Sequence, residues 1–273
     1  MQISVTKNLK MAKSLYAYAD VGRTGLCNML FPWARAVLYA RMMNCSVIAP
    51  RWTKIMRIGP WLRGERDKRY YNGLFTNDGY VKGVGRAYAF IRMLGRIYDE
   101  SSQAIYDLKK GMVVFRGLGN YFMDFPDDAA FLRGELLKIV SERIVERLDE
   151  LPREFIGVHV RCGDFISTGQ SMPNEYYVKG IETAKSIVGS QYPVLVFSDA
   201  KGGELSYLSD CPGVRFMPAA PAIHDVLALS RASILVGTNH SSFSEWAVFL
   251  GGMKSIWSKE GRRPCALFDS VFV

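Results

Sequence analysis

The chain has 273 residues, of which 49% are hydrophobic and 22% are charged, a balance that excludes a disordered protein. No run of about 18 apolar residues occurs, so a membrane-spanning helix is not expected. The net charge is +9, and the whole excess lies in residues 1–150, where 24 Lys and Arg stand against 15 Asp and Glu.

The basic excess is densest between Arg51 and Arg116, where 14 basic residues stand against 6 acidic ones. A field of this sign favours an anionic partner, such as membrane lipid, a lipid-diphosphate-linked glycan or nucleic acid. A solvated basic face without any partner accounts for the same charge equally well.

The cysteines and the first residues bear on the compartment. Five cysteines are present, and none of their spacings is that of zinc ligands. Residues 1–20 contain three lysines and no long apolar core, so no secretory signal is expected. Together these features predict reduced thiols and a cytoplasmic protein.

The first half contains fewer regular patterns than the second. Its predicted elements, in chain order, are a strand at Leu15–Tyr18, a glycine-rich turn at Asp20–Asn28, a helix at Met29–Met43, a strand at Cys45–Ala49 and an amphipathic helix at Phe131–Glu150. The sequence between the second strand and the last helix is irregular and rich in Gly, Tyr and Arg.

The second half alternates short apolar runs with helical patterns. The predicted strands are Phe155–Val160, Pro193–Phe197 and Ser233–Gly237, and the predicted helices are Tyr176–Val188, Asp225–Arg231 and Glu245–Leu250. Such alternation is typical of a parallel α/β sheet. Leu151 and Pro152 resemble a seam between two α/β units, so we predict domains at residues 1–150 and 151–273.

The first candidate site lies at the end of the strand Phe155–Val160, which contains His159 and is followed by Arg161 and Asp164. An arginine at a strand end can bind a diphosphate bidentately and stays charged at any working pH. A fixed guanidinium can therefore stabilise a departing nucleoside diphosphate without a metal. An Arg161–Asp164 ion pair with His159 merely packed is the competing structural interpretation.

Three other segments carry candidate residues. Thr238, Ser241 and Ser242 lie where a strand gives way to a helix, and Ser242 has capping-box spacing to Glu245. Asp225 is either a helix N-cap or an acceptor for a base. The turn Gly22–Phe31 has the glycines that allow close approach to a diphosphate, but it matches no ATP or NAD motif.

Taken in order, these segments resemble the α-1,2-fucosyltransferase family, glycosyltransferase family 11, with weaker similarity to α-1,6- and protein O-fucosyltransferases. The segments that carry the resemblance are GLCNMLFPWA at Gly25–Ala34, FRGLGNYF at Phe115–Phe122, HVRCGD at His159–Asp164, the stretch ending in FSD at Tyr176–Asp199, and Asp225–Trp246.

The resemblance implies a GT-B-like pair of Rossmann-type α/β domains with parallel sheets and a cleft between them. It implies transfer of L-fucose from GDP-fucose to a hydroxyl of an acceptor glycan, with inversion, α-1,2 linkage and no metal cofactor. The expected enzyme is therefore similar to a galactoside 2-α-L-fucosyltransferase.

The resemblance also assigns roles to residues. Arg161 would hold the β-phosphate, while His159 and Asp225 would contact guanosine. The implied catalytic residues are Arg161, Asn28 and Asp164, and the implied donor-binding residues are Gly22, Arg23, Gly25, His159, Arg161, Asp225, Ser241, Ser242 and Phe243. Cys162 stands where the family has a second arginine, and we hypothesise that Arg23 supplies the missing charge. Asp20 and Asp164 are the candidate bases.

The expected partners follow from charge and resemblance together. The basic first half would bind an acceptor oligosaccharide, lipid-linked glycans included, with peripheral contact to anionic lipid at the inner membrane face; nucleic acid is not an expected partner. Two alternatives stay open: a transferase that uses another GDP-sugar, and a catalytically inactive polyanion-binding module. The second would use the tyrosines Tyr70, Tyr71, Tyr80 and Tyr88 between the basic residues.

Overall fold

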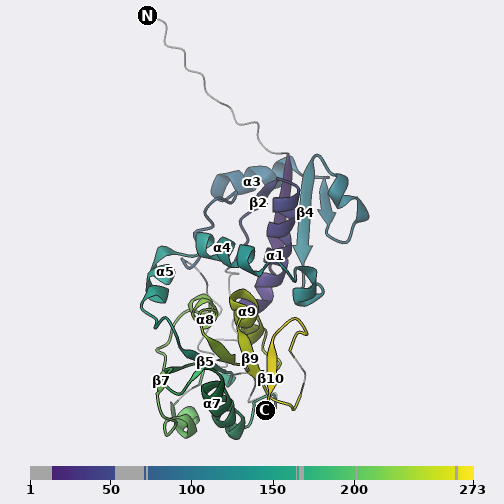
Figure 1. Ribbon diagram of the computed structural model, residues 1–273. Coiled ribbons are helices and arrows are strands. Elements are labelled where there is room, and N and C mark those ends of the chain that lie inside the picture. The colour runs from purple at the N-terminus through teal and green to yellow at the C-terminus, as the bar shows by residue number, and fades with distance from the viewer. Residues whose placement is uncertain are drawn as a thin grey trace, which may run out of the picture.

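The computed structural model describes residues 14–52, 71, 73–163, 165, 169–200, 202–261 and 264–273 (Figure 1). Its strands form two separate sheets, one of four strands and one of six, and every pairing within both sheets is parallel. All strands of the first sheet precede those of the second along the chain. The predicted α/β class with parallel sheets is confirmed.

The first sheet has the order β2-β1-β4-β3. Its strands are β1 (Leu15–Asp20), β2 (Ser46–Ile48), β3 (Ile97–Asp99) and β4 (Gly111–Arg116). Helix α1 (Leu26–Met42) packs on one face and α3 (Gly83–Arg92) on the other. Because side chains alternate along a strand, Ala17 and Ala19 face α1, whereas Tyr16 and Tyr18 face α3.

The second sheet has the order β10-β9-β8-β5-β6-β7. Its strands are β5 (Ile156–Val160), β6 (Val194–Ser198), β7 (Val214–Phe216), β8 (Ile234–Val236), β9 (Lys254–Trp257) and β10 (Ser270–Phe272). Helix α7 (Asn174–Val188) covers one face, and α8 (Ala222–Leu229) and α9 (Ser242–Gly251) cover the other. Short 3-10 helices lie at Gln103–Asp107, Tyr121–Asp124 and Gly202–Leu208.

The predicted single helix at Phe131–Glu150 is wrong, because the structure contains two helices, α4 (Ala129–Ile139) and α5 (Glu142–Asp149). Val140 and Ser141 between them are extended, with ψ angles of 158° and 145°. Val140 bridges Phe75, and the Ser141 N–H donates to the Leu74 carbonyl. These tertiary bonds outweigh the local helical preference of the segment.

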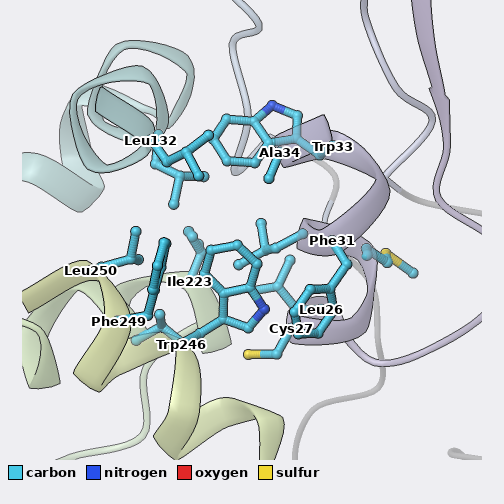
Figure 2. Close-up of a cluster of buried hydrophobic side chains, with 14 of the residues drawn as sticks. Leu26, Cys27, Phe31, Trp33, Ala34, Leu132, Ile223, Trp246, Phe249 and Leu250 are labelled. Atoms are coloured by element: carbon cyan, nitrogen blue, oxygen red, sulfur yellow. The ribbon is translucent and has the colours of Figure 1, made fainter. Parts of the chain in front are cut away.

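The two halves of the chain meet through a buried apolar cluster. Figure 2 shows side chains from α1, α4, α8 and α9 that point into one space. At its centre the rings of Phe31 and Trp246 lie 5.1 Å apart, and both residues are fully buried. Helices α4 and α5 precede the predicted seam at residue 150, yet they pack on α9 and α8. The division into two domains stays a prediction.

A bilayer-crossing helix was not expected from the sequence. Within the described ranges, no helix combines the length and apolar character that crossing a membrane requires.

Candidate functional site

The site is built where neighbouring parallel strands of the second sheet end. Strands β5 and β6 are paired so that Val160 lies opposite Ser198, and the next residues are Arg161 and Asp199. Arg161 Nη1 lies 2.7 Å from Asp199 Oδ2, with the two side chains 25% and 18% exposed. The other oxygen, Oδ1, accepts the Cys162 N–H at 2.8 Å. One carboxylate therefore fixes both the guanidinium and the backbone behind it.

The residue after Cys162 is Gly163, and the position of Asp199 leaves no room for a side chain there. A Cβ at this position would lie 2.5 Å from Asp199 Oδ2, so a larger residue would displace the carboxylate. Asp164, the alternative ion-pair partner of Arg161 and a predicted catalytic residue, lies outside the described residues. Among the described residues, Asp199 pairs with Arg161.

The neighbouring Cys162 is 8% exposed. Burial, reinforced by the charge of Asp199, raises the pKa of its thiol. A buried, protonated thiol therefore adds no positive charge beside Arg161.

His159 is buried in the strand just before Arg161, with 4% of its surface exposed. Its ring stacks on Phe243, with centroids 4.5 Å apart, and its Nδ1 lies 2.7 Å from Ser244 Oγ. Burial, together with the charge of Arg161, lowers the pKa of His159 from 6.5 to about 3. The imidazole is therefore neutral near pH 7 and serves as a neutral hydrogen-bonding group rather than as a proton carrier.

Thr238 joins the end of β5 to the turn before α9. Its buried hydroxyl donates to the His159 carbonyl at 2.6 Å and accepts the Arg161 N–H at 3.2 Å. The Tyr177 hydroxyl lies 2.9 Å from the same oxygen. Burial raises the pKa of Tyr177, so this hydroxyl keeps its proton. These bonds hold the backbone on both sides of Arg161 in place.

The turn from β8 into α9 differs from the predicted capping box. The N-cap is Ser241, which makes no side-chain cap bond, and Ser242 is the first helical residue. The Thr238 N–H donates to Ser244 Oγ instead. The Ser242 hydroxyl donates to Asn28 Oδ1 at 2.9 Å. Capping is thus ruled out as the role of the Ser242 side chain.

The Ser242–Asn28 bond joins the two halves of the chain, because Asn28 lies in the first turn of α1. It brings a predicted donor-binding residue beside a predicted catalytic residue from 214 positions away. The N-termini of α1 and α9 therefore lie together, and helix N-termini favour anionic ligands.

The glycine-rich turn leads from β1 into α1. Gly22 has a φ of +65°, which favours glycine, and Gly25 is the N-cap of α1. A Cβ at either glycine would meet no other atom within 4 Å, so both border open space. Arg23 between them is exposed. At the end of β1, Asp20 Oδ2 lies 3.4 Å from Nε of Arg116.

Asp225 lies in the first turn of α8, whose N-cap is Pro221, so the N-cap interpretation of Asp225 is wrong. Its Oδ1 lies 2.9 Å from Nδ1 of the buried His224. Its proposed contact with guanosine stays a prediction.

The sequence-based search missed Asp199, Ser244 and Tyr177 as parts of the site. Asp199 could have been predicted to lie near Arg161, because each residue follows a predicted strand and the carboxyl ends of neighbouring parallel strands meet at one edge of a sheet. Ser244 and Tyr177 could not have been predicted in this way, since each acts through a partner that only the folded chain brings near.

Two further expectations concern metals and polyanions. In the described part of the chain, no cluster of three or more His, Cys, Asp or Glu side chains could hold a metal ion. Tyr71 is buried, and the Tyr80 hydroxyl accepts a hydrogen bond from Trp33 Nε1. The buried Tyr71 ring is therefore not placed to stack on a nucleobase from the surface, Tyr80 is partly buried, and Tyr70 lies outside the described residues. Tyr88 is exposed.

Residues 115–261, just over half of the chain, match the sequence model described as Glycosyl transferase family 11. The chain belongs to this family. The matched range includes His159, Arg161, Asp225 and the start of α9, whereas Asn28 and the turn at Gly22 lie outside it. No curated protein matches the sequence.

Similar solved structures share the fold of this family 11 member. One is the NodZ α-1,6-fucosyltransferase soaked with GDP-fucose, with a TM-score of 0.53, 17% identity, and coverage of 86% of this chain and 92% of the other. Another is POFUT1 in complex with GDP-fucose, with a TM-score of 0.54, 12% identity, and coverage of 97% and 98%. A third is the fucosyltransferase NodZ from Bradyrhizobium, with a TM-score of 0.53, 17% identity, and coverage of 85% of this chain and 92% of the other. At these identities the likeness shows the fold, and it supports the GT-B-like pair of sheets.

Proposed function

We propose that this family 11 member transfers L-fucose from GDP-fucose to a hydroxyl of an acceptor glycan, by direct displacement with inversion, forming an α-1,2 linkage without a metal. Membership of the family supports glycosyl transfer. The choice of donor is supported by two structures of similar fold that contain GDP-fucose. The α-1,2 linkage is supported by the family resemblance alone, because one of these two proteins is an α-1,6-fucosyltransferase and so gives no support for an α-1,2 linkage.

The observation that carries the proposal is the half-buried guanidinium of Arg161, fixed by Asp199 at the end of β5. As the bond to fucose C1 breaks, negative charge develops on the leaving GDP. A guanidinium has five N–H donors in a rigid fork and can bind a carboxylate and a phosphate together. Because its position is set beforehand, Arg161 stabilises the leaving group without reorganising in the transition state.

The start of α9 would complete the diphosphate site. Its first-turn N–H groups and the positive end of its dipole favour phosphate oxygens. Ser241, Ser242 and Phe243 begin this helix, and Phe243 stacks on His159 beside Arg161. His159 would meet guanosine as a neutral imidazole, because its pKa is about 3.

Asn28 would face the reacting sugar from the other half of the chain. Its side-chain oxygen accepts the Ser242 hydroxyl, so its orientation is fixed by the helix that binds the phosphates. Gly22 and Gly25 border open space in the turn before it, and Arg23 would add positive charge there. For the proton of the acceptor hydroxyl we propose Asp20 or Asp164 as the base, worth about 10²- to 10⁴-fold in rate.

The decisive experiment supplies GDP-fucose, GDP-mannose or a UDP-sugar as the donor and measures release of the corresponding nucleoside diphosphate, GDP or UDP, together with the glycan product. Only GDP-fucose is expected to turn over. Arg161→Ala is expected to lower kcat by about 10²- to 10³-fold, the usual effect of removing one donor that stabilises the transition state. Arg161→Lys should recover part of the loss, since it keeps the charge but not the fork.

Arg41→Ala is the matched control, because Arg41 also pairs with an aspartate, Asp128, but at an exposed position of α1. Its activity should equal that of the wild type. Turnover of another GDP-sugar alone would reassign the donor. Full activity in Arg161→Ala would refute the role of this guanidinium.

A further inference from the structure

Helix α3 presents apolar side chains to solvent along one side. Three of them, together with Leu94 just after the helix, form a face named here the α3 apolar face, with the following exposed fractions: Val84 88%, Tyr88 57%, Ile91 68% and Leu94 72%. The spacing of four and three residues places Val84, Tyr88 and Ile91 in one stripe of the helix, and Leu94 follows the C-cap Met93. The opposite side is the one that packs, since Ala89 and Met93 are fully buried against the first sheet.

An outward stripe of this kind is unusual for a helix that already covers a sheet. Single exposed apolar residues are ordinary, but a contiguous group marks an interaction surface. The α3 apolar face contains aliphatic side chains and one tyrosine, which is the composition of helices that lie in a membrane interface.

Four basic residues border the carboxyl end of α3: Arg92, Arg96, Lys109 and Lys110. They are named here the basic rim. The backbone joins them, because the Arg96 carbonyl accepts the N–H of Met112, which follows Lys110 by two residues. Arg92 also lies over the Tyr88 ring, 5.9 Å from its centroid. Within the part of the chain that the structure describes, none of the four pairs with a carboxylate.

The position of this surface leaves the donor site open. Arg96 and Lys110 precede β3 and β4, so the basic rim lies at the amino-terminal edge of the first sheet. Asn28 follows β1 at the opposite, carboxyl-terminal edge. Figure 1 shows α3 at the end of the molecule far from the second sheet. A partner bound at α3 would therefore not cover Arg161 or the start of α9.

We propose that the α3 apolar face and the basic rim dock this protein on an anionic lipid bilayer. The apolar side chains would enter the boundary between headgroups and acyl chains, while the cations stay among the lipid phosphates. We choose anionic lipid as the partner on the basis of charge, because residues 1–150, which carry this surface, hold the entire net positive charge of +9. The second half has no excess and would face the aqueous side, where the nucleotide sugar is dissolved.

The test is cosedimentation of the full chain with phosphatidylcholine vesicles that contain or lack phosphatidylglycerol. Binding is expected only with the anionic lipid, and it should weaken in about 1 M salt, where the screening length falls to about 3 Å. The double variant Lys109→Gln and Lys110→Gln should lower the partition coefficient about 30-fold, since each cation contributes about fivefold. Ile91→Glu should lower it at least tenfold.

Ile187→Glu is the control, because Ile187 is also an exposed helical isoleucine, 43% exposed, but lies on α7 in the second half. It should bind vesicles as the wild type does. Melting temperatures of all variants within a few degrees of the wild type would establish that the exposed substitutions leave the fold intact.

Three outcomes would overturn the proposal. The first is equal binding to both vesicle types, and the second is unchanged binding of Ile91→Glu. The third is a wild-type dimer in sedimentation velocity that Ile91→Glu converts to a monomer, which would assign the α3 apolar face to a second copy of this chain. Because the readout is lipid binding, failure here is separate from failure of the proposed glycosyl transfer.

Discussion

His159 provides a quantitative test of how the site is built. Its buried ring has a pKa of about 3, against 6.5 for an exposed histidine. Between these two values the unfolded chain binds a proton that the folded protein does not. The free energy of unfolding therefore falls as the pH falls below about 6.5, and it is unaffected by this group at higher pH.

The magnitude follows from the same two values. Each pH unit below the unfolded pKa removes about 1.4 kcal/mol, so a change from about pH 7.5 to about pH 5 removes about 2 kcal/mol through His159 alone. We expect His159→Asn to be less stable than the wild type at neutral pH, because it loses the stack on Phe243. Its loss of stability on acidification should nevertheless be smaller, by about 2 kcal/mol.

The assay is urea unfolding followed by tryptophan fluorescence at the two pH values, since the chain has five tryptophans. His240→Asn is the matched control: His240 is exposed, and asparagine tolerates its φ of +64°. It should retain the full pH dependence of the wild type. If His159→Asn also retained it, the histidine could not be a buried neutral group, and the description of the site around it would be wrong.

Three other predictions concern residues of the proposed donor site. Asp199→Asn removes the ion pair with Arg161 and should lower the rate of GDP release about tenfold, because the guanidinium loses its fixed position; an unchanged rate would show that this carboxylate does not orient it. In a double-mutant cycle, Asn28→Ala and Ser242→Ala should show a coupling of about 0.5–1.5 kcal/mol in the free energy of unfolding, whereas additive effects would contradict the hydrogen bond between them. Arg23→Ala should weaken GDP-fucose binding about tenfold by calorimetry if it replaces the missing family charge, and unaltered affinity and turnover would remove that hypothesis.

Three of the six strands of the second sheet, β5, β6 and β8, could be predicted because they are short, apolar and buried, whereas β7, β9 and β10 were not predicted. Ile156–Val160 and Val194–Ser198 are nearly continuous apolar runs, as expected for central parallel strands. β7 was missed because it is an edge strand whose residues, such as Arg215 and Phe216, are exposed. The break between α4 and α5 was missed because it depends on Leu74 and Phe75, which lie far from it in the sequence.

The site was predictable only where the chemistry is local. Arg161 was found because a charged residue at the end of a buried strand is visible in the sequence. The contact of its backbone N–H with Thr238 was not, since the position of Thr238 depends on β8 lying beside β5, a neighbour that is not consecutive along the chain. The Asn28–Ser242 bond requires the packing of α1 on α9, which no local pattern reveals.

The same packing determines how far the two halves can move. Asn28 and Ser242 lie in the first turns of α1 and α9, and Phe31 and Trp246 follow about one helical turn later, with their rings 5.1 Å apart. A hinge motion that separated Asn28 from Ser242 would also pull these two buried rings apart. Truncating a buried aromatic side chain typically costs about 3–5 kcal/mol, so exposing this cluster would consume a large part of the stability of a domain. In the proposed function, the donor would therefore reach Arg161 with the two helix N-termini already together, because the aromatic cluster behind them acts as a fixed joint rather than a hinge.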